Sequence, residues 1–334
     1  MEEEQLIGIV GTGNIQEKVD ISERFKVKDL ENPRFDERPF LEELKIGEVL
    51  DIPLYTYPQA DFKKEPDLTL GRRLNSIMDA SSKAEVFLRL SLIAGSTPAL
   101  WSLLTKGISS GLSNGTMDII YRVNVPPKVN GLLDNLDIAI GCLQRRIVIS
   151  NVIAKNIASN EVQRIVSIAG GSCIIPIEAI YQIGKYGMQI ASVDYSPKAN
   201  EKAESIKKAG EAKKDLGIGI KYLSSDLINE GVPIETNISN PQLFECTGFW
   251  EYLNPEDRGK FLNRISEAMK DSDTFILTAL VDNPQQDLFD KMGFKQLHPQ
   301  KMEEFIKQIE EADLHVKEVY LTPNKAYATA VVNR

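Results

Sequence analysis

Short apolar runs alternate with helical patterns throughout the second half of the chain. The runs are RIVSIA, QIASVDY, IKYLSSD, QLFECTG and TFILTAL, separated by helical patterns or polar connections. In IIPIEAIYQIGKYG, PKANEKAESIKKAGEA and NPEDRGKFLNRISEAMK, apolar residues recur three and four positions apart, as on one face of a helix. Alternating strands and helices are typical of a mostly parallel sheet covered on both faces. The pattern therefore predicts an α/β domain over residues 161–334.

The end of the chain follows another pattern. HVKEVYLT and YATAVVNR read as strands, and they are separated by little more than PNKA. A connection this short joins antiparallel strands. We therefore expect a β-hairpin whose last strand runs against its neighbour.

The first half of the chain is patterned differently. Residues 1–66 are polar and rich in proline and aromatic residues, which predicts an N-terminal arm with short strands. Residues 67–160 carry helical patterns, one of which opens at Ser82 with Glu85 at the spacing of a capping box. We interpret residues 67–160 as a helical extension of the α/β domain.

Composition narrows the class of protein. The chain has 334 residues, of which 42% are hydrophobic and 26% charged, as in proteins with one large or two smaller domains. It holds no run of eighteen uncharged apolar residues, and it begins with the acidic MEEEQLIGIV, so we expect neither a membrane span nor a secretory signal. The widely spaced cysteines Cys142, Cys173 and Cys246 suggest a reducing compartment without a disulfide framework. We therefore expect a cytoplasmic protein.

The charge balance argues against a nucleic-acid partner. The formal net charge is −9, whereas binding to a phosphate backbone depends on clustered lysine and arginine. Two arginine pairs, Arg72-Arg73 and Arg145-Arg146, lie among apolar residues. We expect both pairs on solvated helix faces.

The chain has two glycine-rich turns. In the first, Gly11-Thr12-Gly13, the third glycine position of a dinucleotide fingerprint holds Gln16. The following segment, EKVDISERFKVKD, alternates like strands, whereas the fingerprint requires a helix there. We therefore favour a hairpin turn over a nucleotide site.

The second turn lies in VSIAGGSC, residues 166–173, between a predicted strand and a predicted helix. Ala169, Gly170 and Gly171 leave the backbone bare, and Pro176 suits the first turn of the helix. Asp194 closes the next strand, close to the spacing of about 20 residues expected for a carboxylate that binds ribose hydroxyls. A structural turn explains the glycines but not this acid, so we favour nucleoside binding.

The same turn narrows the kind of nucleoside. Ile174 and Ile175 occupy the place of the small residue that a pyrophosphate loop needs, and the loop carries no lysine. An adenosyl ligand without phosphates and with an amino-acid tail fits better.

These residues resemble class I, Rossmann-like S-adenosylmethionine-dependent methyltransferases over about half of the chain, from Val162 to the C-terminus. IVSIAGGSC is similar to the glycine-rich first motif, and CTGFWEYL to the segment after the fourth strand. Asp194 in SVDYSP and Asp226 in YLSSDL stand where the family binds the ribose and the adenine amino group. The resemblance implies a Rossmann-like, mostly parallel seven-stranded sheet with an antiparallel C-terminal hairpin, and S-adenosyl-L-methionine as cofactor.

The resemblance also implies a set of cofactor-binding residues. The backbone of the turn would lie along the methionine portion, Tyr195 near the adenine, and Thr247 with Gly248 near the sulfonium. For Asp226, a helix N-cap is an equally good reading. The full set is Ala169, Gly170, Gly171, Ser172, Asp194, Tyr195, Asp226, Leu227, Thr247 and Gly248.

The turn departs from the family pattern in three places. Ser167 stands where the family usually has an acid that holds the amino group of the cofactor. Ala169 replaces the first glycine and Cys173 the last. Because cysteine tolerates a positive φ poorly, we expect the loop to bend a little differently.

Methyl transfer from a sulfonium needs alignment and exclusion of water more than acid–base groups, so neither a metal nor a catalytic triad is expected. For an alcohol or amine acceptor, a general base would help. The candidates are His298, Glu251 and Tyr252, although a loop or helix-capping role for His298 is favoured. Trp250 reads as core, and His315 as structural.

The helical extension is expected to cap the cofactor pocket and to select the acceptor. Its polar residues of first interest are Tyr121, Arg122, Arg145 and Arg146, and one of the arginines is a candidate partner for the cofactor's carboxylate. We expect an enzyme that methylates a small-molecule or lipid-like acceptor. The alternatives are a catalytically inactive cofactor-binding or regulatory protein on the same fold, and an NAD(P)-dependent oxidoreductase.

Overall fold

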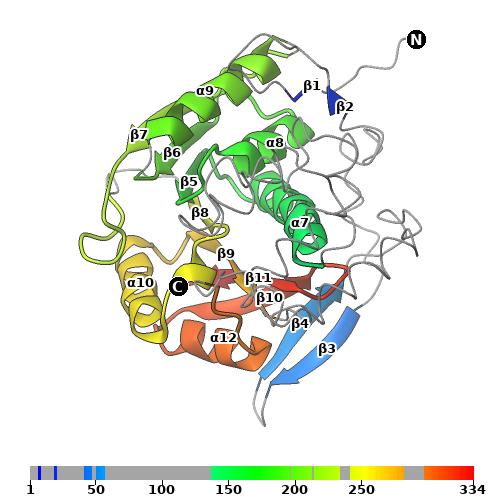
Figure 1. Ribbon diagram of the computed structural model, residues 1–334, viewed down its shortest axis with the longest axis vertical. Helices are drawn as coiled ribbons and strands as arrows, with labels where there is room; N and C mark the ends of the chain where they lie inside the picture. Colours follow the sequence, from blue (N-terminus) through cyan, green and yellow to red (C-terminus); the bar gives the residue numbers. More distant parts are fainter. Residues whose placement is uncertain are drawn as a thin grey trace, which may run out of the picture.

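A nine-stranded sheet forms the centre of the molecule (Figure 1). The structure is a computed structural model, and it describes residues 7–8, 19–20, 41–46, 50–56, 137–195, 197–212, 214–233, 241–281 and 297–334. Arg72, Arg73, Tyr121 and Arg122, and the helices expected between residues 67 and 136, lie outside the described residues.

The seven strands predicted between residue 164 and the C-terminus are all present, and two N-terminal strands extend their sheet. The sheet order is β3-β4-β10-β11-β9-β8-β5-β6-β7. The strands are β3 (Leu41–Ile46), β4 (Leu50–Thr56), β5 (Arg164–Ile168), β6 (Gln189–Val193), β7 (Gly219–Leu223), β8 (Gln242–Cys246), β9 (Thr274–Leu280), β10 (His315–Leu321) and β11 (Tyr327–Asn333).

The strand directions confirm the predicted fold class. β5 pairs in parallel with both β6 and β8, β6 with β7, and β8 with β9. β11 runs antiparallel to β9 and to β10, as the hairpin signal predicts. The strands β5 to β11 therefore form a mostly parallel sheet with a reversed last strand.

The N-terminal strands join this sheet at its edge. β4 pairs in parallel with β10, and β3 pairs antiparallel with β4. The sequence predicts short strands in this region but gives no sign that they extend the sheet. A separate pair, β1 (Ile7–Gly8) and β2 (Val19–Asp20), is antiparallel, as expected for the hairpin around the first glycine turn. The turn itself lies outside the described residues.

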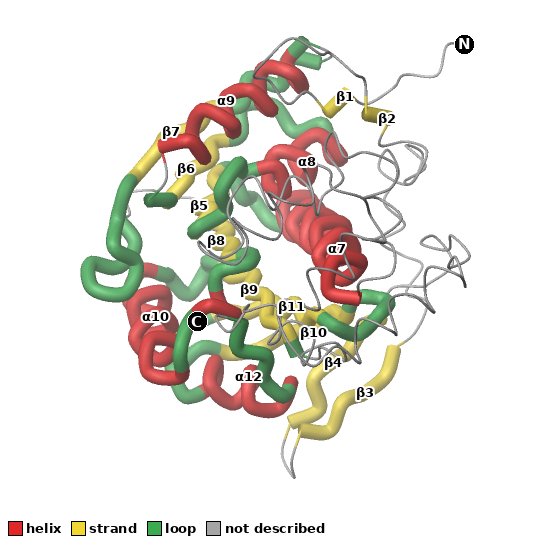
Figure 2. The backbone as a smooth tube through the Cα atoms, in the orientation of Figure 1, coloured by secondary structure: helices red, strands yellow, loops and turns green. Residues whose placement is uncertain are grey.

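Helices cover both faces of the sheet (Figure 2). α7, α8 and α9 share one apolar core with the strands, and α10 and α12 share a second core on the opposite face. In the described part of the chain, none of the helices combines the length and apolar character that crossing a bilayer requires. The helices are α7 (Asp137–Ser159), α8 (Ile174–Ile183), α9 (Pro197–Glu211), α10 (Pro255–Ala268) and α12 (Met302–Glu310).

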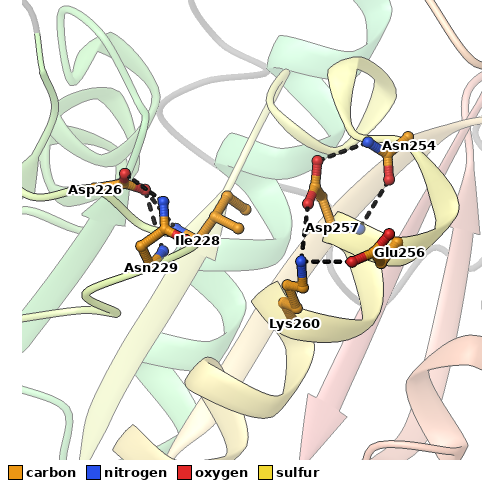
Figure 3. A network of polar contacts seen from close by, with 7 residues as sticks. All are labelled: Asp226, Ile228, Asn229, Asn254, Glu256, Asp257 and Lys260. Atoms are coloured by element: carbon orange, nitrogen blue, oxygen red, sulfur yellow. Dashed lines mark hydrogen bonds and ion pairs between the residues drawn. The ribbon is translucent and has the colours of Figure 1, made fainter.

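The start of α10 shows how local sequence sets a helix boundary (Figure 3). The Asn254 side chain accepts a hydrogen bond from the Asp257 amide at 2.9 Å, and Pro255 occupies the first helical position. Such a cap stabilises a helix by about 1 kcal/mol. Lys260 forms an ion pair with Glu256 one turn earlier, at 2.7 Å.

The expectation that Arg145 and Arg146 lie on a solvated helix face is wrong. Both are buried, with exposed fractions of 1% and 4%, because α7 lies flat against the sheet and α8. Buried guanidinium groups require partners. Arg146 pairs with Glu178 of α8, and Arg145 pairs with Glu251 after β8.

Candidate functional site

The carboxyl ends of β5, β6 and β8 bring three loops together at one edge of the sheet. From β5 the chain passes to β6 on one side, and it later returns to β8 on the other side of β5. In open α/β sheets, ligands bind at such a reversal of strand order, outside the carboxyl ends of the strands. The loops that start at Ala169, Asp194 and Thr247 meet there.

The glycine-rich turn has an unusual backbone. Gly171 has φ 58°, and Ala169 and Cys173 are also left-handed, with φ 50° and 52°. The Ala169 amide donates to the Val193 carbonyl at 2.8 Å, which ties the turn to the end of β6. A left-handed residue other than glycine costs roughly 1–2 kcal/mol, so this turn holds conformational strain.

Cys173 adopts the left-handed conformation as the residue that precedes α8, although cysteine disfavours this conformation. Its side chain is completely buried in the core beneath α7 and α8. Burial raises the pKa of its thiol to about 12. Packing therefore imposes the conformation that the side chain disfavours.

Position 170 has no room for a side chain, because Ser167 and Glu245 occupy the space next to its Cα atom. A Cβ atom at this position would lie 2.0 Å from the Ser167 hydroxyl oxygen and 2.9 Å from Oε1 of Glu245. The protein interior thus requires glycine at this point, independently of any ligand.

Asp194 is half-buried and connects the turn to β6. Its Oδ2 accepts a hydrogen bond from the Gly171 amide at 3.0 Å. The carboxylate therefore lies beside the glycine-rich turn, as the proposed ribose-binding role requires. Tyr195, the next residue, is 85% exposed. Ser172 is half-buried in the turn.

Glu245 is a polar residue at this edge that the sequence analysis overlooks. It is 1% exposed and stands directly opposite Ser167 in the register of β8 and β5. Ser167 donates to its Oε1, and Thr247 donates to its Oε2 at 2.9 Å. Burial raises the pKa of Glu245 to about 7, although the two hydroxyls and Arg145 act in the opposite direction. The signal in the sequence is a single acid within the otherwise apolar run QLFEC.

The turn after β8 also needs a glycine. Gly248 has φ 82°, a conformation in which an L side chain is strained. A Cβ atom at this position would lie 3.2 Å from Nη2 of Arg145. Arg145 of α7 thus lies directly beneath the loop in which Thr247 and Gly248 are proposed to approach the sulfonium.

The prediction that Glu251 faces an acceptor as a general base is wrong. Its side chain is 0% exposed, and its Oε1 accepts from Nη1 of Arg145 at 2.6 Å. The short helix η3 (Trp250–Tyr252) turns Trp250 and Glu251 inward and leaves Tyr252 half-buried. The same ion pair occupies Arg145, one of the arginines considered as a partner for the cofactor's carboxylate.

Asp226 caps a turn after β7 (Figure 3). Its Oδ1 accepts from the amides of Ile228 and Asn229, both at 3.1 Å, and its Oδ2 accepts from the Asn229 side chain at 2.7 Å. These bonds lower its pKa. Leu227 is 8% exposed and packs in the core. The capping reading accounts for these hydrogen bonds of Asp226, and the adenine role stays a prediction.

His298 lies beside the loop that follows β8. Its amide donates to the Glu251 carbonyl at 2.7 Å, its carbonyl accepts from Arg258 at 2.6 Å, and its side chain is exposed. His315 is exposed at the start of β10, at the end of the sheet opposite to the loops described above. Trp250 is fully buried and donates to Gln300, so its reading as core is confirmed.

Comparison with known proteins shows a likeness of fold at low identity. No family model matches the chain, and no curated protein matches it. Mitomycin 7-O-methyltransferase MmcR is 18% identical with a TM-score of 0.43, over 78% of this chain and 75% of that one. Magnesium protoporphyrin IX methyltransferase (ChlM) from Synechocystis PCC 6803 is 14% identical with a TM-score of 0.48, over 70% and 99%.

A third solved structure, an O-methyltransferase family 2 protein from Planctomyces limnophilus, is 12% identical with a TM-score of 0.44, over 80% of this chain and 94% of that one. These similarities concern the fold alone. The fold that the resemblance implied rests on the sheet itself, in which β11 is reversed and lies between β9 and β10. A Rossmann-like sheet with the strand arrangement of class I S-adenosylmethionine-dependent methyltransferases is therefore confirmed.

Proposed function

We propose that the protein transfers a methyl group from S-adenosyl-L-methionine to a small-molecule or lipid-like acceptor. One observation carries this proposal: the Asp194 carboxylate is hydrogen-bonded to the Gly171 amide where the strand order of the sheet reverses. This is the place in an α/β sheet where ligands bind, and it holds an acid suited to a ribose diol.

The chemistry of the donor set agrees with an adenosyl ligand. A carboxylate has about four acceptor sites, so the bond from Gly171 is compatible with further bonds from two ribose hydroxyls. The exposed ring of Tyr195 follows the acid and offers an aromatic face for a base. The segment Ala169–Cys173 contains no lysine or arginine to neutralise a pyrophosphate.

When bound, S-adenosyl-L-methionine would supply a methyl group already activated by the sulfonium charge. The residues of this chain would then hold and orient it. Ala169 to Ser172 would lie along the methionine portion, and Thr247 with Gly248 would approach the reacting centre. Correct alignment of two reactants removes a large part of the barrier to an in-line displacement.

The class of acceptor is inferred from the net charge of the chain and from the residues near the loop after β8. The negative net charge disfavours a nucleic-acid acceptor. With Glu251 buried in an ion pair, His298 and Tyr252 are the general-base candidates at this edge of the sheet. We also propose that residues 67–160 select the acceptor, although α7 itself packs on the sheet as part of the α/β core.

Isothermal titration calorimetry with S-adenosylmethionine, S-adenosylhomocysteine, NAD⁺ and NADP⁺ tests the proposal. We expect saturable one-site binding of the two adenosyl-sulfur compounds and none of the dinucleotides. Tight binding without turnover over a panel of hydroxyl and amine acceptors would favour a regulatory, non-catalytic protein. Binding of a nicotinamide cofactor alone would contradict the proposal and favour an oxidoreductase.

A further inference from the structure

Glu245 joins the two loops that flank the proposed cofactor. Its Oε1 accepts from Ser167, two residues before Ala169, and its Oε2 accepts from Thr247, the first residue after β8. One carboxylate is therefore bonded to the base of both loops.

Gly170 places the backbone of the turn directly above this carboxylate. A Cβ atom at Gly170 would lie 2.9 Å from Oε1 of Glu245 and even closer to Ser167, so carboxylate, hydroxyl and glycine form one close-packed contact. A displacement of the carboxylate would therefore also displace the backbone of the turn at Gly170. Close-packed interiors transmit such displacements because they contain little free volume.

The charges around Glu245 come from several elements. Arg145 of α7 is the nearby cation, and it is shared with Glu251 of η3. Cys173 before α8 and Cys246 of β8 are buried thiols whose pKa values are raised, and both feel the negative charge of Glu245. Asp194 at the end of β6 faces Cys173 from the other side of the turn.

We propose that Glu245 is a positioning residue that fixes the cofactor loops in its protonated form and loosens them when it is ionised. This inference rests on the function proposed above. An ionised carboxylate accepts from Ser167 and Thr247 at the same time. A protonated carboxyl donates to Ser167 at one oxygen and accepts from Thr247 at the other, so both loops stay bonded to a neutral group. Ionisation instead places a charge in the buried interior beneath the turn, where burial disfavours it.

The proton balance of this switch is simple. The proton comes from solvent and enters the carboxyl group, whose O–H then donates to the Ser167 oxygen. The bond between Ser167 and Glu245 thus persists with its direction reversed. With its pKa near 7, Glu245 changes charge close to neutral pH.

Two readouts as a function of pH test the proposal, and the first needs no cofactor. Amide hydrogen exchange reports the protection factors of Gly171 and Cys173, whose amides donate to Asp194 and to Gly170. Calorimetry reports the dissociation constant of S-adenosylhomocysteine. From pH 6 to pH 8 we expect protection to fall and the dissociation constant to rise roughly tenfold, which corresponds to a difference of about one pKa unit between free and bound protein.

Variants separate positioning from a purely structural role. Glu245→Gln keeps the shape but cannot titrate, so both profiles should become flat. Ser167→Ala removes one donor to the carboxylate and should shift the midpoint of both profiles to higher pH. Asp273→Asn is the control, because Asp273 is a buried carboxylate at the opposite end of the sheet that accepts from the Gln242 and Lys270 amides.

The outcomes are distinct. Flat profiles in the wild type, or unchanged profiles in Glu245→Gln, would overturn the inference. The wild-type profile needs no mutation, so poor folding of a variant leaves the test intact. If protection depends on pH through Glu245 but no adenosyl-sulfur compound binds at any pH, the proposed function fails while the positioning role of Glu245 stands.

Discussion

Arg145 of α7 and Glu251 of η3 form an ion pair of 2.6 Å whose two side chains are 1% and 0% exposed. The guanidinium carbon of Arg145 also lies 4.4 Å from the centre of the Tyr327 ring. This contact fastens the helix that precedes the α/β domain to the loop after β8. The loop after β8, which contains Thr247 and Gly248, is therefore anchored to α7 through this ion pair.

Removing one partner of this pair should destabilise the protein strongly. Arg145→Ala leaves the Glu251 carboxylate buried without its cation, which typically costs about 3–5 kcal/mol. The measurement is the free energy of unfolding in urea. The exposed pair of Lys260 and Glu256 is the control, and Lys260→Ala should leave this free energy nearly unchanged. Equal effects of the two substitutions would contradict the account of the buried pair.

Glu245 should make the stability of the protein depend on pH. The folded protein holds its proton up to about pH 7, whereas an unfolded glutamic acid releases it near pH 4.5. Between these values the folded state binds more protons. The contribution of Glu245 is therefore greatest below pH 4.5 and is lost as the pH rises through 7.

The difference in unfolding free energy between wild type and Glu245→Gln isolates this contribution. We expect the wild type to lose up to about 3 kcal/mol relative to the variant between pH 4.5 and pH 8, at about 1.4 kcal/mol per pKa unit. Urea unfolding at several pH values measures it. A difference that is constant with pH, or that changes in the opposite sense, would show that Glu245 titrates normally.

Gly170→Ala should destabilise the protein by about 1–3 kcal/mol, because the added methyl group would overlap Ser167 and Glu245. Removing the hydroxyl relieves the closest contact, so Ser167→Ala should recover part of the loss when it is combined with Gly170→Ala. Thermal unfolding of the single and double variants measures this coupling.

Gly259 of α10 is the matched control for Gly170. A Cβ atom there meets no other atom within 4 Å, so Gly259→Ala should stabilise its helix by roughly 0.5–1 kcal/mol. If Gly170→Ala and Gly259→Ala change the stability of the protein by the same amount, the packing beneath position 170 is not the reason for its glycine.

The alternation of apolar runs and helical patterns predicts the order of β5 to β11 because each element is long enough to show its period. QLFEC and TFILTAL read as buried strands, and β8 and β9 are buried along their whole length. The short connection PNKA predicts the reversed last strand for the same local reason. Which N-terminal strand pairs with β10 depends on a contact distant in sequence, and periodicity carries no information on it.

The polar residues beneath the site could not be predicted in the same way. Arg145 and Arg146 read as surface residues because charges usually are, and Glu251 reads as a residue that faces the acceptor. Their partners lie 32 or 106 positions away in the chain. Glu245 and Ser167 become a pair only through the register of β5 and β8. Asp194, in contrast, stands out in the sequence because strand ends and glycine turns have a fixed spacing in this type of sheet.

The most direct test of the proposed function is the affinity of Asp194→Ala for S-adenosylhomocysteine by isothermal titration calorimetry. Asp215→Ala, which removes an equal charge in the turn before β7, at the end of the sheet opposite to Asp194, is the control. We predict that binding weakens by about 1–3 kcal/mol in Asp194→Ala, the cost of losing a charged acceptor, and not in the control. An unchanged dissociation constant in a folded Asp194→Ala protein would contradict the account.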